Sequence, residues 1–169
     1  MTVERPITWL KNPRAQARES IDTLAEILPP EAPRQARAFH RQIPGYHISP
    51  LKSLPHLAAR LGLGGIWVKD ESARLNLGSF KVLGGSFAIY QLLKRRLGLE
   101  SQAISFEELT HGPLRDQLGE VTFAAATDGN HGRGVAWSAT QMGFRSVIYV
   151  HRLTSQARIQ AIGWHCHCW

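Results

Sequence analysis

The sequence has 169 residues, of which 43% are hydrophobic, and 20 Lys and Arg against 13 Asp and Glu give it a formal net charge of +7. Aromatic and branched residues are spread along the chain, so the composition excludes a disordered protein and allows one globular domain with a buried core. The basic residues are scattered, which argues against a nucleic-acid partner, and a small anionic ligand fits the charge equally well. No stretch is long and apolar enough to span a bilayer and the N-terminus has no signal peptide, so we expect no membrane partner and a cytoplasmic protein.

Local signals predict the elements of the first half. Apolar residues at helical spacing predict a helix over 17–28, which Pro29 and Pro30 end. We then expect, in chain order, a short helix over 36–42, extended chain over 46–51, a helix over 53–61 with Ser53 as its N-cap, a strand over 65–69 and a loop over 70–79.

The second half shows alternating strand and helix signals. A broad apolar face predicts a helix over 80–97, and the segment 99–120 offers one further helix at 106–109. Uninterrupted apolar runs predict buried strands over 121–126 and 146–150, with helices over 131–142 and 155–162 after them. This order predicts an α/β fold in which helices flank a parallel sheet.

Lys81 is the residue of most chemical interest. It follows Ser79 and Phe80 and precedes Gly84 and Gly85. Its apolar neighbours predict a buried helix start, and the positive end of a helix dipole disfavours a lysine charge. Both conditions favour the neutral amine that Schiff-base chemistry needs. A surface lysine in the first turn of a helix is the alternative that the residues leave open, whereas helix packing explains the two glycines better than a phosphate cradle does.

A polar loop, Thr127 to Gly134, follows an apolar run and opens a helix. The free amides at a helix start attract anions and glycines allow close approach, so this loop suits a carboxylate or phosphate. Asn130 can donate and accept hydrogen bonds there. Asp128 would repel such a ligand, which makes it a candidate base. The residues equally allow Asp128 to cap the helix and His131 to pack.

The two cysteines, Cys166 and Cys168, alternate with His165 and His167 at the end of the chain. Thiols and imidazoles in so short a run could bind zinc or copper. A terminal tail has no helix or turn to set tetrahedral geometry, however, and the composition changes abruptly after Gly163. We therefore expect no metal site and a tail, 164–169, that is unrelated to the fold.

Several segments together resemble a known enzyme group, the fold-type II pyridoxal-phosphate enzymes of the tryptophan synthase β-like superfamily. The resemblance runs from about Tyr46 to Gly163. Within the group, the chain resembles the diaminopropionate ammonia-lyases most, because serine and threonine deaminases usually have serine in place of Asp128. The segments that carry the resemblance are Ser49–Leu51, Val68–Ser72, Ser79–Gly85, Thr127–Trp137 and Ser155–Arg158.

The resemblance implies pyridoxal 5'-phosphate as the cofactor and assigns a role to each of six residues. Lys81 matches the lysine that bonds covalently to the cofactor aldehyde, and Asp128 matches an acid that serves as a second base. The remaining assignments are Phe80 packing beside the cofactor ring, Asn130 binding the cofactor's phenolic oxygen, and Gly129, Asn130 and His131 holding the substrate carboxylate.

The implied reaction is the α,β-elimination of 2,3-diaminopropionate, a small amino acid, to pyruvate and ammonia. Lys81 would take the α-proton on one face and Asp128 on the other, so that both enantiomers react. Two alternative functions are open. One is a serine or threonine dehydratase with the same fold, and the other is a non-catalytic binding module.

The resemblance also divides the chain into a lead-in with short helices (1–45), the N-terminal part of a cofactor-dependent enzyme domain (46–163) and the tail (164–169). Members of the group continue well beyond Gly163, and their phosphate cradle and the groups that face the pyridine nitrogen lie in that later half. We therefore expect a fragment whose C-terminal half is missing, inactive and poorly folded alone, while the full-length relative forms a homodimer.

Overall fold

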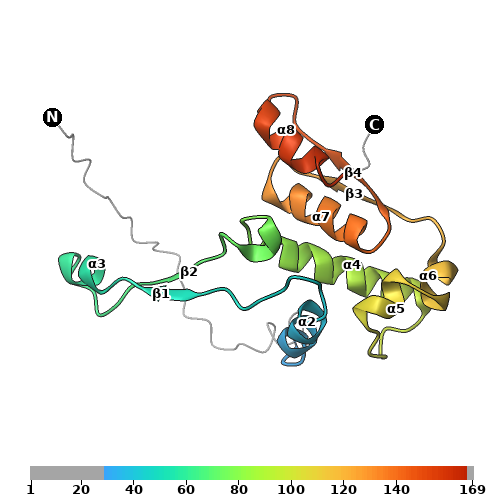
Figure 1. Ribbon diagram of the computed structural model, residues 1–169, viewed down its shortest axis with the longest axis horizontal. Helices are drawn as coiled ribbons and strands as arrows, with labels where there is room; N and C mark the ends of the chain where they lie inside the picture. The colour runs from blue at the N-terminus through green and yellow to red at the C-terminus, as the bar shows by residue number, and fades with distance from the viewer. Residues whose placement is uncertain (1–28, 167–169) are drawn as a thin grey trace, which may run out of the picture. The chain divides into compact units, whose positions relative to one another are not determined.

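A computed structural model describes residues 29–166 (Figure 1). The chain divides into two units, Met1–Arg34 and Gln35–Trp169, and every contact discussed below lies within the second. The described helices and strands are α2 (Ala32–His40), β1 (Leu51–Ser53), α3 (Pro55–Arg60), β2 (Trp67–Lys69), the 3-10 turn η1 (Arg74–Asn76), α4 (Lys81–Leu97), α5 (Phe106–Thr110), α6 (Pro113–Leu118), β3 (Thr122–Ala126), α7 (Asn130–Gln141), β4 (Arg145–Tyr149) and α8 (Gln156–Gly163).

A β–α–β unit forms the second half of the chain. β3 and β4 pair in parallel, from Thr122 opposite Arg145 to Ala126 opposite Tyr149, and α7 connects them. This parallel pair confirms the predicted α/β class. The prediction that both strands are buried is wrong for the described residues, because α7 covers one face only. On the other face the side chain of Tyr149 is 65% exposed.

The other two strands form a separate sheet. β1 and β2 pair antiparallel, with Ser53 opposite Trp67, so the prediction of a single parallel sheet holds for β3 and β4 alone. The pairing also uses Ser53 as a strand residue, and the predicted N-cap is therefore wrong. Helix α3 starts two residues later at Pro55, whose fixed φ suits the first helical position.

Helices α4 and α7 pack closely against each other, and Figure 1 shows them side by side. A Cβ placed on Gly134 would lie 2.9 Å from the Cα of Val82, so only glycine allows this approach. On the facing helix, a Cβ on Gly85 would meet Val135 at 3.5 Å. Helix packing therefore accounts for Gly85, as predicted, while nothing lies within 4 Å of the same point on Gly84.

The hydrophobic core lies around the second half of α4. The ring of Phe39 stacks on that of Tyr90 with 4.3 Å between centroids, and Leu93 and Leu109 are almost fully buried beside them. The hydroxyl of Tyr90 donates to the carbonyl of Ile104, which satisfies the one polar atom of this ring.

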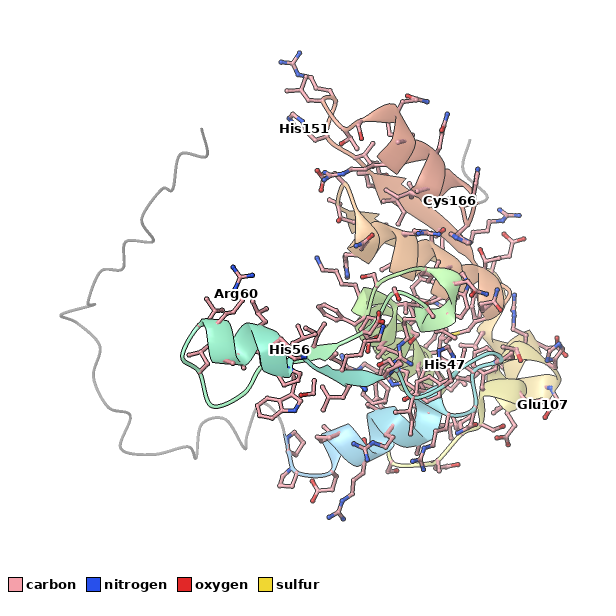
Figure 2. The ribbon with its side chains drawn as sticks, turned by 60° about the vertical axis from the view of Figure 1, so that its left-hand side comes forward. His47, His56, Arg60, Glu107, His151 and Cys166 are labelled. Atoms are coloured by element: carbon pink, nitrogen blue, oxygen red, sulfur yellow. The ribbon has the colours of Figure 1, made fainter. Side chains whose placement is uncertain are left out.

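The long helices confirm the sequence predictions to within one or two residues. The structure adds α6 to the segment 99–120, where one helix is predicted, and it begins α2 at Ala32 rather than at residue 36. The helix predicted over 17–28 lies outside the described residues, as do His167 and Cys168 of the tail. Figure 2 places Cys166 after the end of α8, where its sulfur lies 3.4 Å from the hydroxyl oxygen of Ser146.

Across residues 29–166, no helix combines the length and the hydropathy that a membrane span requires.

Candidate active site

Lys81 is the first residue of α4, directly after Phe80 at the N-cap. The backbone N–H of Lys81 donates to the hydroxyl oxygen of Ser79 at 3.3 Å. Lys81 is exposed, and the side chain of Phe80 is 61% exposed, whereas Val82 is buried. The predicted burial of this lysine is therefore wrong for the described residues, because the apolar face of α4 is formed by Val82 and the residues one turn apart from it.

The loop between β3 and α7 carries the second group of predicted residues. The backbone N–H of Thr127 donates to the carbonyl of Tyr149, which continues the strand pairing up to the loop. Gly129 is the N-cap of α7 and no side chain caps the helix, so Asp128 does not have the capping role. A Cβ on Gly132 would lie 2.8 Å from side-chain atoms of both Thr127 and Ile148, so glycine allows α7 to start close to the sheet.

These two segments meet at one cleft of about 310 Å³. It brings together four of the predicted site residues, namely Lys81, Asp128, Gly129 and Asn130. Phe80 and His131 are exposed and do not line it. Segments about 45 residues apart in the sequence therefore share a site, because the close contact of α4 with α7 brings their first turns together.

Two arginines, Arg133 and Arg158, complete the polar lining of the cleft. Neither is among the predicted site residues, although both lie in segments that carry the resemblance. Arg158, from α8, places its Nη1 3.4 Å from Oδ2 of Asp128, and both side chains are more than half exposed. The cleft therefore holds three cationic side chains, Lys81, Arg133 and Arg158, against one carboxylate.

A buried ion pair holds the chain that leads to Lys81. Nε of Arg74 donates to Oε2 of Glu71 at 2.7 Å, and the side chain of Arg74 is only 3% exposed. The hydroxyl of Ser49 donates to Glu71, and the carbonyl of His47 accepts from Arg74. The hydrogen bond with Arg74 lowers the pKa of Glu71 below its ordinary value, and the same contact raises the pKa of Arg74. The segment 70–79 is thereby anchored to the chain before β1.

The arrangement suits a phosphorylated aldehyde. An exposed primary amine stands in a cleft with a positive balance of charge, next to the uncapped start of a 12-residue helix. Backbone amides and guanidinium groups bind anionic oxygens, and a lysine amine bonds to a carbonyl carbon. The residues present therefore fit pyridoxal phosphate.

Comparison with known proteins gives the same result. The family model described as "Pyridoxal-phosphate dependent enzyme" matches residues 43–164. The diaminopropionate ammonia-lyase of Escherichia coli strain K12 is 48% identical over 128 residues, which are 75% of this chain and 31% of that protein. Its counterpart in Salmonella typhimurium is 44% identical, also over 128 residues, which are 76% of this chain and 32% of that protein.

The fold is similar as well. A crystal structure of the Escherichia coli diaminopropionate ammonia-lyase in complex with D-serine matches with a TM-score of 0.72 and 45% identity, over 80% of this chain and 34% of that one. The chain thus spans about a third of the length of the curated relatives it matches. Since the family model covers most of the chain and the cleft fits the cofactor, this protein belongs to the family of pyridoxal-phosphate dependent enzymes.

Proposed function

We propose that this chain carries the reactive lysine and an acid of an enzyme that eliminates ammonia from 2,3-diaminopropionate. The single observation that carries the proposal is that Lys81 and Asp128 line one cleft, although they come from different elements. The identity to diaminopropionate ammonia-lyases supports the choice of substrate.

The reaction removes the α-proton and the β-amino group of the substrate. Pyridoxal phosphate, when bound, supplies a carbonyl carbon that bonds to amines and an electron-poor ring that takes up charge from the α-carbon. Nζ of Lys81 accepts the α-proton on one face, and a carboxylate oxygen of Asp128 accepts it on the other. The β-amino group leaves as ammonia, and the released enamine takes up one water to give pyruvate and a second ammonia.

Other residues of the cleft bind and orient the substrate and the cofactor. We assign the substrate carboxylate to the uncapped start of α7, at Gly129 and Asn130, and a cofactor oxygen to the amide of Asn130. The cleft gives no support to Phe80 beside the ring or to His131 at the carboxylate, and these two roles stay predictions. A homodimer and a role in cytoplasmic amino-acid catabolism likewise stay predictions, which sedimentation and cell fractionation of the protein would check.

Chemical labelling tests the lysine assignment. The protein is mixed with pyridoxal phosphate, reduced with borohydride and mapped by peptide mass spectrometry. We expect the label on Lys81 and its loss in Lys81→Arg. The matched control is Lys52→Arg, because Lys52 is a 60% exposed lysine on β1 that pairs with Asp70, and this variant keeps the label. A label that stays on another lysine in Lys81→Arg contradicts the proposal.

A kinetic comparison tests the substrate. Pyruvate formation by the full-length relative is measured with D- and L-diaminopropionate and with L-serine at equal concentrations, because the chain spans about a third of its relatives' length and is expected to be inactive alone. We expect both diaminopropionate isomers to react faster than serine, because Asp128 offers a base for the second face. Preference for L-serine would favour the dehydratase alternative instead.

A further inference from the structure

Arg133 joins the two segments that meet at the Lys81 cleft. It lies in the first turn of α7, and its Nη1 donates to the backbone carbonyl of Leu77 at 3.0 Å. Leu77 is 4% exposed and lies four residues before Lys81. The hydrogen bond therefore links the first turn of α7 to the segment that precedes the reactive lysine, across 56 residues of sequence.

The segment that receives this bond has an unfavourable backbone. Leu75 has φ 47° and Asn76 has φ 59°, and both lie in the left-handed region that residues other than glycine rarely adopt. Gly78 follows with φ 64°. Such conformations persist where the surrounding structure holds them in place. A hydrogen bond to Leu77, in the middle of this run, is placed to do so.

The neighbouring residue fixes the same junction from the other side. A Cβ on Gly134 would lie 2.9 Å from Cα and 3.1 Å from N of Val82, and 3.3 Å from the carbonyl carbon of Lys81. Arg133 and Gly134 thus contact the chain before Lys81 and the chain after it. The two contacts together hold the backbone on both sides of Lys81 against the first turn of α7.

The guanidinium of Arg133 has no carboxylate partner among the described residues. Its Nε is buried without a hydrogen-bond partner among the described residues, and within that part of the chain it forms no ion pair. The side chain of Arg133 lines the cleft, and in the described part of the chain its hydrogen bond goes to the backbone carbonyl of Leu77 next to the site.

We propose that Arg133 is a positioning residue, which holds the segment 75–80 through the Leu77 carbonyl and so sets the position of Lys81 relative to Asp128. This inference rests on the proposed function for its catalytic meaning. Its structural content concerns the backbone of 75–82 and stands without a bound cofactor.

The test uses three variants of the full chain. Arg133→Met removes the donor and keeps the stem, and Arg133→Lys keeps a charge and a donor. Arg145→Met is the control, because Arg145 is a 68% exposed arginine on β4 that pairs with Glu120 outside the cleft. Two quantities are measured: deuterium uptake of the peptide covering 75–82 without cofactor, and the rate of pyridoxal-phosphate labelling of Lys81 under borohydride.

We expect Arg133→Met to raise deuterium uptake in 75–82 and to slow labelling of Lys81 by roughly tenfold, since small displacements of a reacting group cost large factors in rate. Arg133→Lys should recover most of the labelling rate, and Arg145→Met should change neither quantity. Unchanged uptake in Arg133→Met overturns the proposal, whatever the label does. If Arg133→Met does not fold, the shorter and uncharged Arg133→Gln replaces it in both measurements, and deuterium uptake unchanged from the unsubstituted chain then overturns the proposal.

Failure of the proposed function looks different. In that case Lys81 is not labelled even in the unsubstituted chain. Deuterium uptake then still separates Arg133→Met from Arg145→Met, and it alone decides whether Arg133 holds the segment.

Discussion

Nη1 of Arg158 lies 3.4 Å from Oδ2 of Asp128, and this ion pair joins the start of α8 to the loop before α7 at the mouth of the Lys81 cleft. Both side chains are more than half exposed, so water screens the attraction and the pair contributes little to stability. The pair matters instead because it places a positive and a negative side chain at the edge of the cleft.

The first prediction concerns Arg158→Gln. We expect the free energy of unfolding to change by less than about 1 kcal/mol, because the pair is exposed. Affinity for pyridoxal phosphate should fall roughly two- to fivefold at low salt and less at high salt, because the cleft loses one of its three cationic side chains. Absorbance titration at two salt concentrations measures this. Arg152→Gln, an exposed arginine outside the cleft, is the control, and an equal effect there would point to net charge alone.

The second prediction concerns Asp128→Asn. If Asp128 takes the proton from one face of the substrate and Lys81 from the other, the variant should lose most turnover with one enantiomer of diaminopropionate. A loss of roughly 10²-fold or more is expected for that enantiomer, and a smaller loss for the other. Pyruvate release measures both rates, with the substitution made at the matching position of the full-length relative, because the chain alone is expected to be inactive. Asp116→Asn, an exposed carboxylate on α6, should leave both unchanged, and an equal loss for both enantiomers in Asp128→Asn would rule out the two-base assignment.

The third prediction concerns pH and His40. Nε2 of this buried histidine lies 2.8 Å from the carbonyl oxygen of Leu83 and donates to it. Burial lowers the pKa of His40 below its ordinary value of 6.5, the Leu83 hydrogen bond opposes this shift, and the charge of Arg74 adds to it. The unfolded chain therefore binds the proton more readily than the folded one. The contribution of neutral His40 to the free energy of unfolding is therefore fully present above about pH 6.5 and is lost as the pH falls below that value.

Urea unfolding between pH 5 and pH 8 (a range of about three units around the ordinary histidine pKa) measures this slope. His40→Gln should flatten it, even if the variant is less stable at every pH. His165 adds slope of the same sign, because burial and the charge of Arg133 lower its pKa too, so some slope should remain. His56→Gln is the control, since His56 is exposed on α3 (Figure 2), and it should leave the slope intact.

The fourth prediction concerns Glu71→Gln. Arg74 is 3% exposed and depends on Glu71 for its charge partner. Removing one member of a buried pair leaves an uncompensated charge, so we expect a loss of about 3 kcal/mol in the free energy of unfolding. The unsubstituted protein should lose the same contribution in acid, as the pH falls from the ordinary value of 4.5 through the lowered pKa of Glu71. Glu107→Gln, an exposed residue on α5 (Figure 2), should change stability by less than about 0.5 kcal/mol.

Sequence reasoning works well here where the signal is local. Helices α4 and α7 begin and end within one residue of their predicted bounds, because apolar periodicity runs through them and Gly98 and Gly143 stop them in the left-handed conformation. The capping box of Ser105 and Glu108 is a similar local signal and locates the start of α5 at Phe106. Such signals depend on residues within one turn of each other.

Sequence reasoning misses the features that depend on contacts between residues far apart in the chain. The antiparallel pairing of Ser53 with Trp67 is set by the chain between them, and strand propensity alone cannot distinguish it from a parallel arrangement. Arg133 and Arg158 acquire their places in the cleft through partners 56 and 30 residues away. The exposure of Lys81 depends on which side of α4 faces α7, and a run of apolar neighbours does not fix that side.

The fifth prediction uses two glycines on the packed helices. In Gly134→Ala the new methyl group would lie 2.9 Å from Cα and 3.1 Å from N of Val82, and backbone atoms cannot move aside as a flexible side chain can. The gain in helix propensity, about 1 kcal/mol, is then outweighed by a packing cost of about 1–3 kcal/mol. Gly84→Ala places its methyl group in open space on α4 and should keep the gain.

We therefore expect Gly84→Ala to raise the free energy of unfolding, and Gly134→Ala to leave it unchanged or lower it. Urea or thermal unfolding measures both. Because α7 must shift away from Lys81 to admit the methyl group, Gly134→Ala should also slow borohydride labelling of Lys81, whereas Gly84→Ala should not. Stabilisation by both alanines would mean that α4 and α7 do not approach as closely as the contact between Gly134 and Val82 requires.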